Sequence, residues 1–175
     1  MIARVAAVTA AALLCAWGLV HLAYVPHRCN AEITRLTART DAAGKPASDY
    51  ERLLRVRRNL QDLEPLRETC PTEVRVPMLM GANHEIAGRP EDALRSYREA
   101  LAIEQRPEIY VAIAVQQIQT GRVDEAIDNY VTAARFDPNL VPEIHSRELR
   151  RRVAERLRVT RDALAPVSAG RGRSQ

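Results

Sequence analysis

The chain has 175 residues, of which 46% are hydrophobic and 27% charged, so it suits one ordinary folded domain and not a disordered protein. Aromatic residues make up only 4% and there are only seven Gly, which speaks against an all-β sandwich or barrel. The net charge of +4 is uneven: residues 147–175 carry nine Arg against three acidic residues, so the rest of the chain is slightly acidic.

Residues 1–28 predict an N-terminal signal-anchor that forms a transmembrane helix. Residues 5–25 carry no formal charge, and a helix of this length covers about 32 Å, enough to cross a hydrocarbon core. A cut after Ala16 or Ala23 would put Leu14 or His21 where a signal peptidase needs a small residue, so we favour an uncleaved anchor. The alternative is a cleaved signal and a soluble periplasmic protein. We expect a single-pass protein of the inner (cell) membrane, with its helical domain on the periplasmic or extracytoplasmic side.

Residues 29–73 predict a helical N-cap segment and linker. Cys29 and Cys70 are the only two cysteines outside the anchor. An exported domain uses such a pair for one disulfide, so we expect these two to bond; the alternative is two unrelated reduced cysteines in a cytoplasmic domain.

Within this segment, Ser48 begins S-D-Y-E, a capping box that predicts the start of a helix. We expect this helix to run to about Glu64 and to bury its apolar side chains, which are Tyr50, Leu53, Leu54, Leu60 and Leu63.

Residues 74–140 contain an internal repeat. A shift of 33 residues superposes GRPEDALRSYREAL (88–101) on GRVDEAIDNYVTAA (121–134), so that Tyr97 pairs with Tyr130. A helix-length stretch precedes each block. The paired positions are Gly88 and Gly121 at the turn, Ala93 and Ala126, Ala100 and Ala133, and Gly81 and Ala114 in the preceding stretch.

These two blocks resemble the tetratricopeptide repeat (TPR). The resemblance implies an all-α fold, in which two TPR-like helical hairpins form a short α-solenoid. In the family the first helix of each repeat lines a concave groove. The matching positions, which we expect to bind a partner, are Arg75, Met78, Ala82, Glu85, Ile86, Glu108, Val111, Val115, Ile118 and Gln119.

This predicted groove is largely apolar, since Met78, Ala82, Val111 and Val115 stand where chaperone-binding relatives carry a basic carboxylate clamp. Binding of a chaperone tail is therefore not expected. A helix of the same chain, an amphipathic helix of a partner, or a second copy could each cover it.

Residues 141–164 predict a basic capping helix, followed by a disordered tail over residues 165–175. Leu149, Val153 and Leu157 recur every four residues and form the stripe to be buried. The remaining faces are rich in Arg, so they are either solvated or contact an acidic partner or anionic lipid; nucleic acid is not expected. These residues are Arg147, Arg150, Arg151, Arg152, Arg156, Arg158 and Arg161.

No sequence motif of a catalytic centre, metal site or cofactor site occurs, so we expect no catalytic residue, metal or cofactor. His84 is interpreted as core or half-buried. We expect a non-catalytic, membrane-anchored TPR-like scaffold or assembly factor that mediates protein–protein interactions in the cell envelope. Its partners would be proteins of a membrane or envelope complex. The alternative is a small accessory subunit of a larger membrane complex, held mainly by its transmembrane helix.

Overall fold

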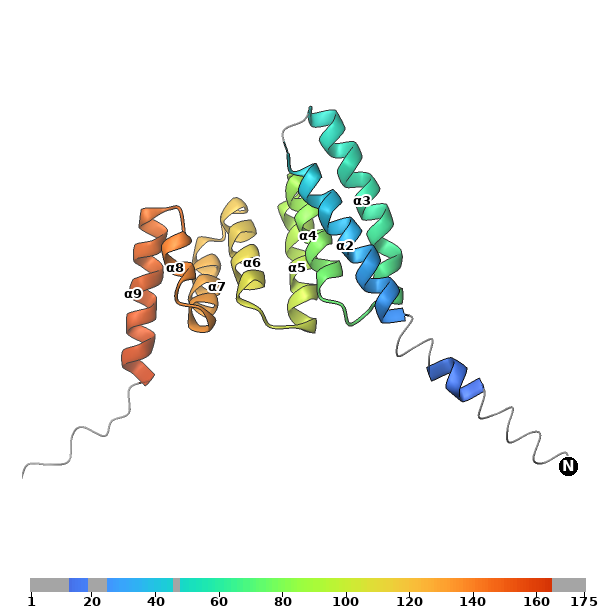
Figure 1. The fold of residues 1–175 in the computed structure, drawn as a ribbon. Helices are drawn as coiled ribbons and strands as arrows, with labels where there is room; N and C mark the ends of the chain where they lie inside the picture. The colour runs from blue at the N-terminus through green and yellow to red at the C-terminus, as the bar shows by residue number, and fades with distance from the viewer. Residues whose placement is uncertain (1–12, 19–24, 46–47, 165–175) are drawn as a thin grey trace, which may run out of the picture. The chain divides into compact units, whose positions relative to one another are not determined.

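The computed structural model describes residues 13–18, 25–45 and 48–164, and the elements within these ranges are helices (Figure 1). The chain divides into two compact units, residues 1–104 and 105–175, each with its own hydrophobic core. From α2 onward the helices are α2 (Val25–Ala43), α3 (Asp49–Thr69), α4 (Arg75–Ile86), α5 (Pro90–Ile103), α6 (Pro107–Gln119), α7 (Val123–Phe136), α8 (Leu140–Glu143) and α9 (Arg147–Leu164). The prediction of an all-α fold is confirmed.

Most of the predicted anchor falls on residues 1–12 and 19–24, which lie outside the described part of the chain, as does the predicted tail. Among the residues that are described, none of the helices combines the length and the apolar character needed to span a bilayer.

In the first unit, α2 and α3 form an antiparallel pair (Figure 1). The Ser48 side chain accepts a hydrogen bond from the Glu51 backbone N–H at 3.2 Å, which confirms the predicted start of α3. The expected end at Glu64 is wrong, because α3 continues through Pro65 to Thr69. A proline inside a helix removes one backbone hydrogen bond, and here the packing of the helix outweighs that loss.

The prediction of which α3 side chains are buried is wrong in its N-terminal half. Tyr50, Leu53 and Leu54 are 73%, 50% and 48% exposed, whereas Leu63 is buried and Leu60 is half-buried. The fully buried stripe of α3 consists of Val56, Asn59 and Leu63, spaced three and four residues apart.

The core of the first unit forms where α2, α3 and α4 meet. Ile33 and Leu36 of α2, Leu63 of α3, and Val76 and Met80 of α4 belong to one buried cluster. Cys29 and Cys70 belong to the same cluster, and a disulfide joins them, as predicted. The two cysteines therefore bind the start of α2 covalently to the end of α3.

The helices α4 and α5 form one hairpin and α6 and α7 another, and both turn at a glycine. Gly88 and Gly121 have φ of 68° and 78°, in the left-handed region that favours glycine. Both glycines follow the end of a helix, and the same hydrogen bond closes each turn. The Arg89 N–H donates to the His84 C=O at 2.9 Å, and the Arg122 N–H donates to the Gln117 C=O at 2.7 Å. The repeat shift of the sequence therefore corresponds to a repeat of backbone geometry.

The two repeat tyrosines lie in equivalent places. Tyr97 is 4% and Tyr130 7% exposed, on the second helix of its own hairpin. Tyr130 shares a buried cluster with Ala114 of α6, and the Tyr97 ring lies against Gly81 of α4. The small residue in each first helix therefore makes room for the tyrosine of the second.

The close fit at Gly81 makes a test of this packing. A Cβ added there would lie 2.5 to 2.8 Å from three ring carbons of Tyr97. We expect Gly81→Ala to lower the free energy of unfolding by about 1–3 kcal/mol, even though alanine favours helices. Urea unfolding followed by circular dichroism measures this. Gly44→Ala is the matched control, because its Cβ would meet neighbours only at 3.7 and 3.8 Å. If Gly81→Ala were no less stable than Gly44→Ala, the close packing would be refuted.

In the second unit, α9 covers one face of α7. Leu149 and Val153 are buried with Ile127 and Tyr130 in one cluster, and Leu157 packs against it half-buried. Two ion pairs connect the same helices: Arg152 to Asp124 at 2.6 Å and Arg156 to Asp128 at 2.9 Å.

Candidate partner-binding surfaces

The ten residues predicted to line a groove fall into two sets of five, one on α4 in the first unit and one on α6 in the second. Within each set the residues recur at helical spacing and so share a face of their helix. The members of the α4 set are Arg75, Met78, Ala82, Glu85 and Ile86, and those of the α6 set are Glu108, Val111, Val115, Ile118 and Gln119.

The α4 set is half-buried, and its two charged members are engaged within their own unit. Arg75 pairs with Glu73 at 2.8 Å and donates to Asn30 of α2 at 3.0 Å. Glu85 accepts a hydrogen bond from the Tyr97 hydroxyl at 3.0 Å. Burial and the Glu85 carboxylate together raise the pKa of Tyr97 above its usual range. These charged groups therefore serve the packing of α2, α4 and α5.

The α6 set is more open. Glu108, Ile118 and Gln119 are exposed, with Ile118 at 38%. Val111 and Val115 are half-buried and pack against the core cluster of the second unit. Ile118 is thus the apolar member of this set that a partner could reach without disturbing that core.

Several arginines of α9 are occupied within the chain. Arg152 and Arg156 pair with α7, and Arg151 pairs with Glu148 at 2.9 Å. Arg147 and Arg158 are exposed and form no ion pair with a described residue. The predicted basic surface is therefore smaller than the arginine count of the sequence indicates.

A buried polar network connects three helices of the first unit, and sequence reasoning missed it. The Asn59 Nδ2 donates to the Asn83 Oδ1 at 3.0 Å, and the Asn83 Nδ2 donates to the Thr40 Oγ1 at 2.8 Å. Asn59 is 1%, Asn83 0% and Thr40 4% exposed. A low-dielectric interior makes such bonds specific, because any misplaced partner leaves a polar group unsatisfied. The network fixes α2, α3 and α4 against one another.

His84 is half-buried on α4, as expected, and its Nδ1 is buried without a hydrogen-bond partner among the described residues. Burial, aided by the charge of Arg89, lowers the pKa of His84 below 6.5. As the pH falls, His84 therefore becomes protonated at a higher pH in the unfolded chain than in the folded one. Among the described residues, His, Cys, Asp and Glu side chains form no group that could hold a metal ion.

This pKa shift predicts a pH dependence of stability. As the pH falls from about 6.5 through the lower pKa of the folded state, the free energy of unfolding should decrease. We expect His84→Gln to flatten that decrease. Urea midpoints measured between about pH 7 and 5 test this. An unchanged slope in the His84→Gln variant would contradict it.

Comparisons with known proteins define the fold. No family model and no curated protein matches the chain. Among solved structures, the chain is similar to the crystal structure of a thermophilic TPR protein from Thermus thermophilus, with a TM-score of 0.60 and 24% identity. The match covers 79% of this chain and 68% of that one. The chain therefore has a TPR-like helical fold, and the likeness extends beyond the two repeats that are visible in the sequence.

Proposed function

We propose that this protein is a non-catalytic scaffold or assembly factor, anchored to a membrane, that brings envelope proteins together through its TPR-like helices. A TPR-like fold suggests an interaction scaffold because its stacked helix pairs present extended binding surfaces. The observation that carries the proposal is the open end of the α6 face. There, in the last turns of α6, exposed Ile118 and Gln119 adjoin the half-buried Val115.

Two features support a place outside the cytoplasm. Residues 5–25 are long and uncharged enough for a signal-anchor. Disulfides persist in oxidising compartments, and the geometry of α2 and α3 brings Cys29 and Cys70 into bonding contact. Tethering the helical domain to the bilayer would raise its local concentration around membrane partners.

An anchor exchange tests the scaffold against an accessory subunit held by its transmembrane helix. Residues 1–24 are replaced by an unrelated membrane-spanning helix of the same orientation, and crosslinked partners are identified from intact membranes. A scaffold keeps the partners of the natural chain after the exchange. Loss of all partners, with the domain still folded and exported, would show that the anchor itself makes the contacts.

Thiol labelling tests the compartment. Cells are lysed into a thiol reagent with and without prior reduction. We expect Cys29 and Cys70 to react only after reduction, while Cys15 serves as the internal reference for a free thiol. Equal labelling of all three without reductant would contradict export.

A further inference from the structure

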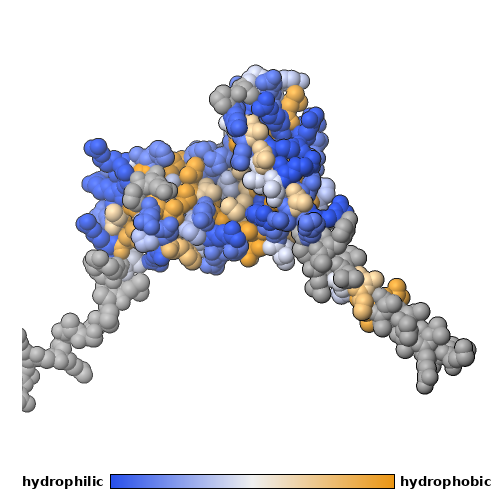
Figure 2. Space-filling view, in the orientation of Figure 1, coloured by the Kyte–Doolittle hydropathy of each residue, from blue (hydrophilic) through white to orange (hydrophobic). Residues whose placement is uncertain are grey.

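The N-terminal half of α3 exposes an apolar strip that no described residue covers. Tyr50, Leu53 and Leu54 are each about half exposed or more and lie at positions i, i+3 and i+4, so they share one face of the helix. Figure 2 shows hydrophobic atoms among hydrophilic ones at the end of the α2–α3 pair where α3 begins. Single exposed apolar residues are ordinary, but a contiguous strip indicates an interaction surface.

One turn further along α3, two arginines continue this strip. Arg57 and Arg58 are exposed and form no ion pair with a described residue. We call Tyr50, Leu53, Leu54, Arg57 and Arg58 the α3 surface.

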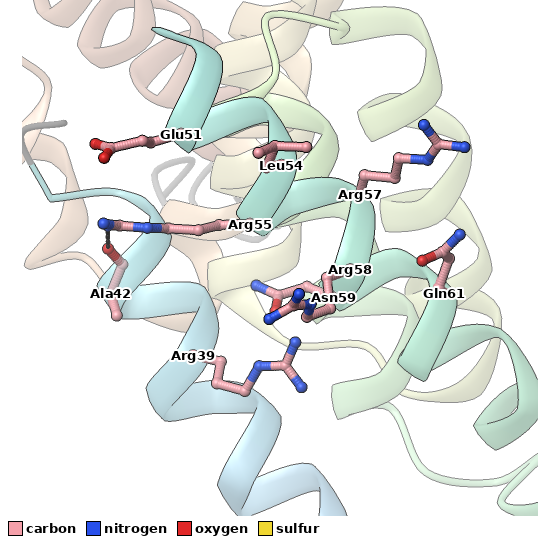
Figure 3. A pocket seen from close by; sticks show the side chains of 9 residues that line it. All are labelled: Arg39, Ala42, Glu51, Leu54, Arg55, Arg57, Arg58, Asn59 and Gln61. Carbon is pink, nitrogen blue, oxygen red and sulfur yellow. Dashed lines mark hydrogen bonds between the residues drawn. The ribbon is translucent and has the colours of Figure 1, made fainter. Parts of the chain in front are cut away.

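A hollow between α2 and α3 adjoins the α3 surface, and its lining is strongly basic (Figure 3). Arg39, Arg55, Arg57 and Arg58 contribute to it, and Glu51 is the one carboxylate among the lining residues. Arg39 is neutralised by Asp62 at 2.5 Å, and Arg55 donates to the Ala42 carbonyl at 3.2 Å.

The unpaired charges narrow the choice of what covers the α3 surface. Residues 1–24 and 165–175, most of which lie outside the described part of the chain, contain no Asp or Glu side chain that could pair with Arg57 and Arg58. In a symmetric contact between two copies, each α3 surface would bring two arginines and no carboxylate, so the net charges of the two surfaces repel. The occupant must therefore carry acidic groups of its own.

Position favours a protein over lipid headgroups. α2 rises about 27 Å from its start to its end. Because α3 returns antiparallel and the disulfide joins Cys29 to Cys70, Asp49 lies at the end of the pair remote from Val25. An anchor that precedes Val25 would thus hold the α3 surface on the side away from its attachment.

We infer that the α3 surface is a docking site for an acidic amphipathic helix of a partner protein. The apolar face of that helix packs on Tyr50, Leu53 and Leu54, and carboxylates one turn away pair with Arg57 and Arg58. The inference concerns α3 and not the α6 face, so either surface can hold if the other fails, while the choice of a protein over lipid rests on the proposed anchor.

The test uses the full chain in phosphatidylcholine nanodiscs and two fluorescent amphipathic peptides. Both peptides carry Leu along one helical face; one has Glu and the other Lys beside that face. Fluorescence anisotropy should show tighter binding of the Glu peptide, weakening as salt rises. Arg57→Glu with Arg58→Glu should weaken the Glu peptide about tenfold and favour the Lys peptide instead. Leu54→Ser should weaken both peptides.

Arg98→Glu with Arg135→Glu is the matched control. Both arginines are exposed on other helices, and the two substitutions change the net charge by the same amount. Circular dichroism confirms that each variant is folded. Equal binding of both peptides, or the same loss in the control, would overturn the inference.

Lipid and self-association give outcomes of their own. A bimane label on Leu54→Cys, in a Cys15→Ser background, should not respond when phosphatidylglycerol replaces phosphatidylcholine in the disc. A blue shift without peptide would assign the α3 surface to lipid and overturn the inference. Self-association is measured in detergent. If the chain dimerises and Arg57→Glu with Arg58→Glu strengthens the dimer, the α3 surface is assigned to a second copy, and the inference is overturned as well.

Discussion

Replacing Cys29 and Cys70 together by Ser is expected to lower the free energy of unfolding of the first unit by about 4 kcal/mol. The disulfide closes a long loop, since the two cysteines are 41 residues apart, and the chain-entropy model gives this value for such a loop. The unfolded chain gains freedom when the bond is absent. The folded unit loses the covalent connection between the ends of α2 and α3.

The division into two units makes this effect local and therefore easy to measure. Amide hydrogen exchange followed by mass spectrometry should show faster exchange in α2, α3 and α4 of the double variant, and unchanged exchange in α6, α7 and α9. Cys15→Ser is the control, because Cys15 is a free, exposed cysteine. Unchanged protection of α2 and α3 in the double variant would show that the disulfide does not stabilise the unit.

Asn83→Leu is expected to lower the free energy of unfolding by about 3 kcal/mol, although it replaces a buried polar residue by an apolar one of similar volume. Without the Asn83 amide, the Asn59 Nδ2 loses its acceptor and the Thr40 Oγ1 loses its donor, at positions from which water is excluded. Each unsatisfied buried group costs about 1–3 kcal/mol.

A double variant separates the network from simple packing. Asn59→Leu with Asn83→Leu removes two of the three partners together and should recover part of the loss. Asn129→Leu is the control: this residue is half-buried in the second unit and donates to Gln117 at 2.8 Å, so its loss should cost about 1 kcal/mol or less. Urea unfolding measures all three. Equal costs for Asn83→Leu and Asn129→Leu would contradict the role given to the buried network.

Much of the fold was predictable because local chemistry and the repeat agree. The 33-residue shift located both turn glycines and both tyrosines, and the S-D-Y-E sequence located the start of α3. The cysteine pair was predicted from composition and compartment, and the structure joins it. Each of these signals depends on residues that are near in sequence or recur at a fixed distance.

The buried face of α3 was not predictable, because its apolar residues fit more than one stripe. Leu53, Leu54 and Leu60 suggest one face, whereas contact with α2 and α4 buries the face of Val56, Asn59 and Leu63. An asparagine in an amphipathic helix normally indicates solvent, so nothing in the sequence marked Asn59 or Asn83 as a core partner.

The sequence predicted which residues share a face of α6, and the structure shows how much of that face is covered. Repeat spacing placed Val111 and Val115 together in a groove that the same chain, a partner or a second copy could cover, and both pack against the core of their own unit. The spacing of a helix gives the face on which a residue lies, while the neighbouring helices decide how much of that face stays open. Ile118 is the apolar residue of the α6 set that remains exposed.

Photo-crosslinking at Ile118 in intact membranes tests most directly whether the helical domain is a tethered docking platform. A photoreactive phenylalanine analogue replaces Ile118 on α6, or Phe136 on α7, which is 54% exposed and serves as the control. The proposal predicts a discrete protein adduct at position 118 that the control lacks and that Gln119→Glu in the same chain weakens. No adduct at position 118, or the same adducts at both positions, would contradict it.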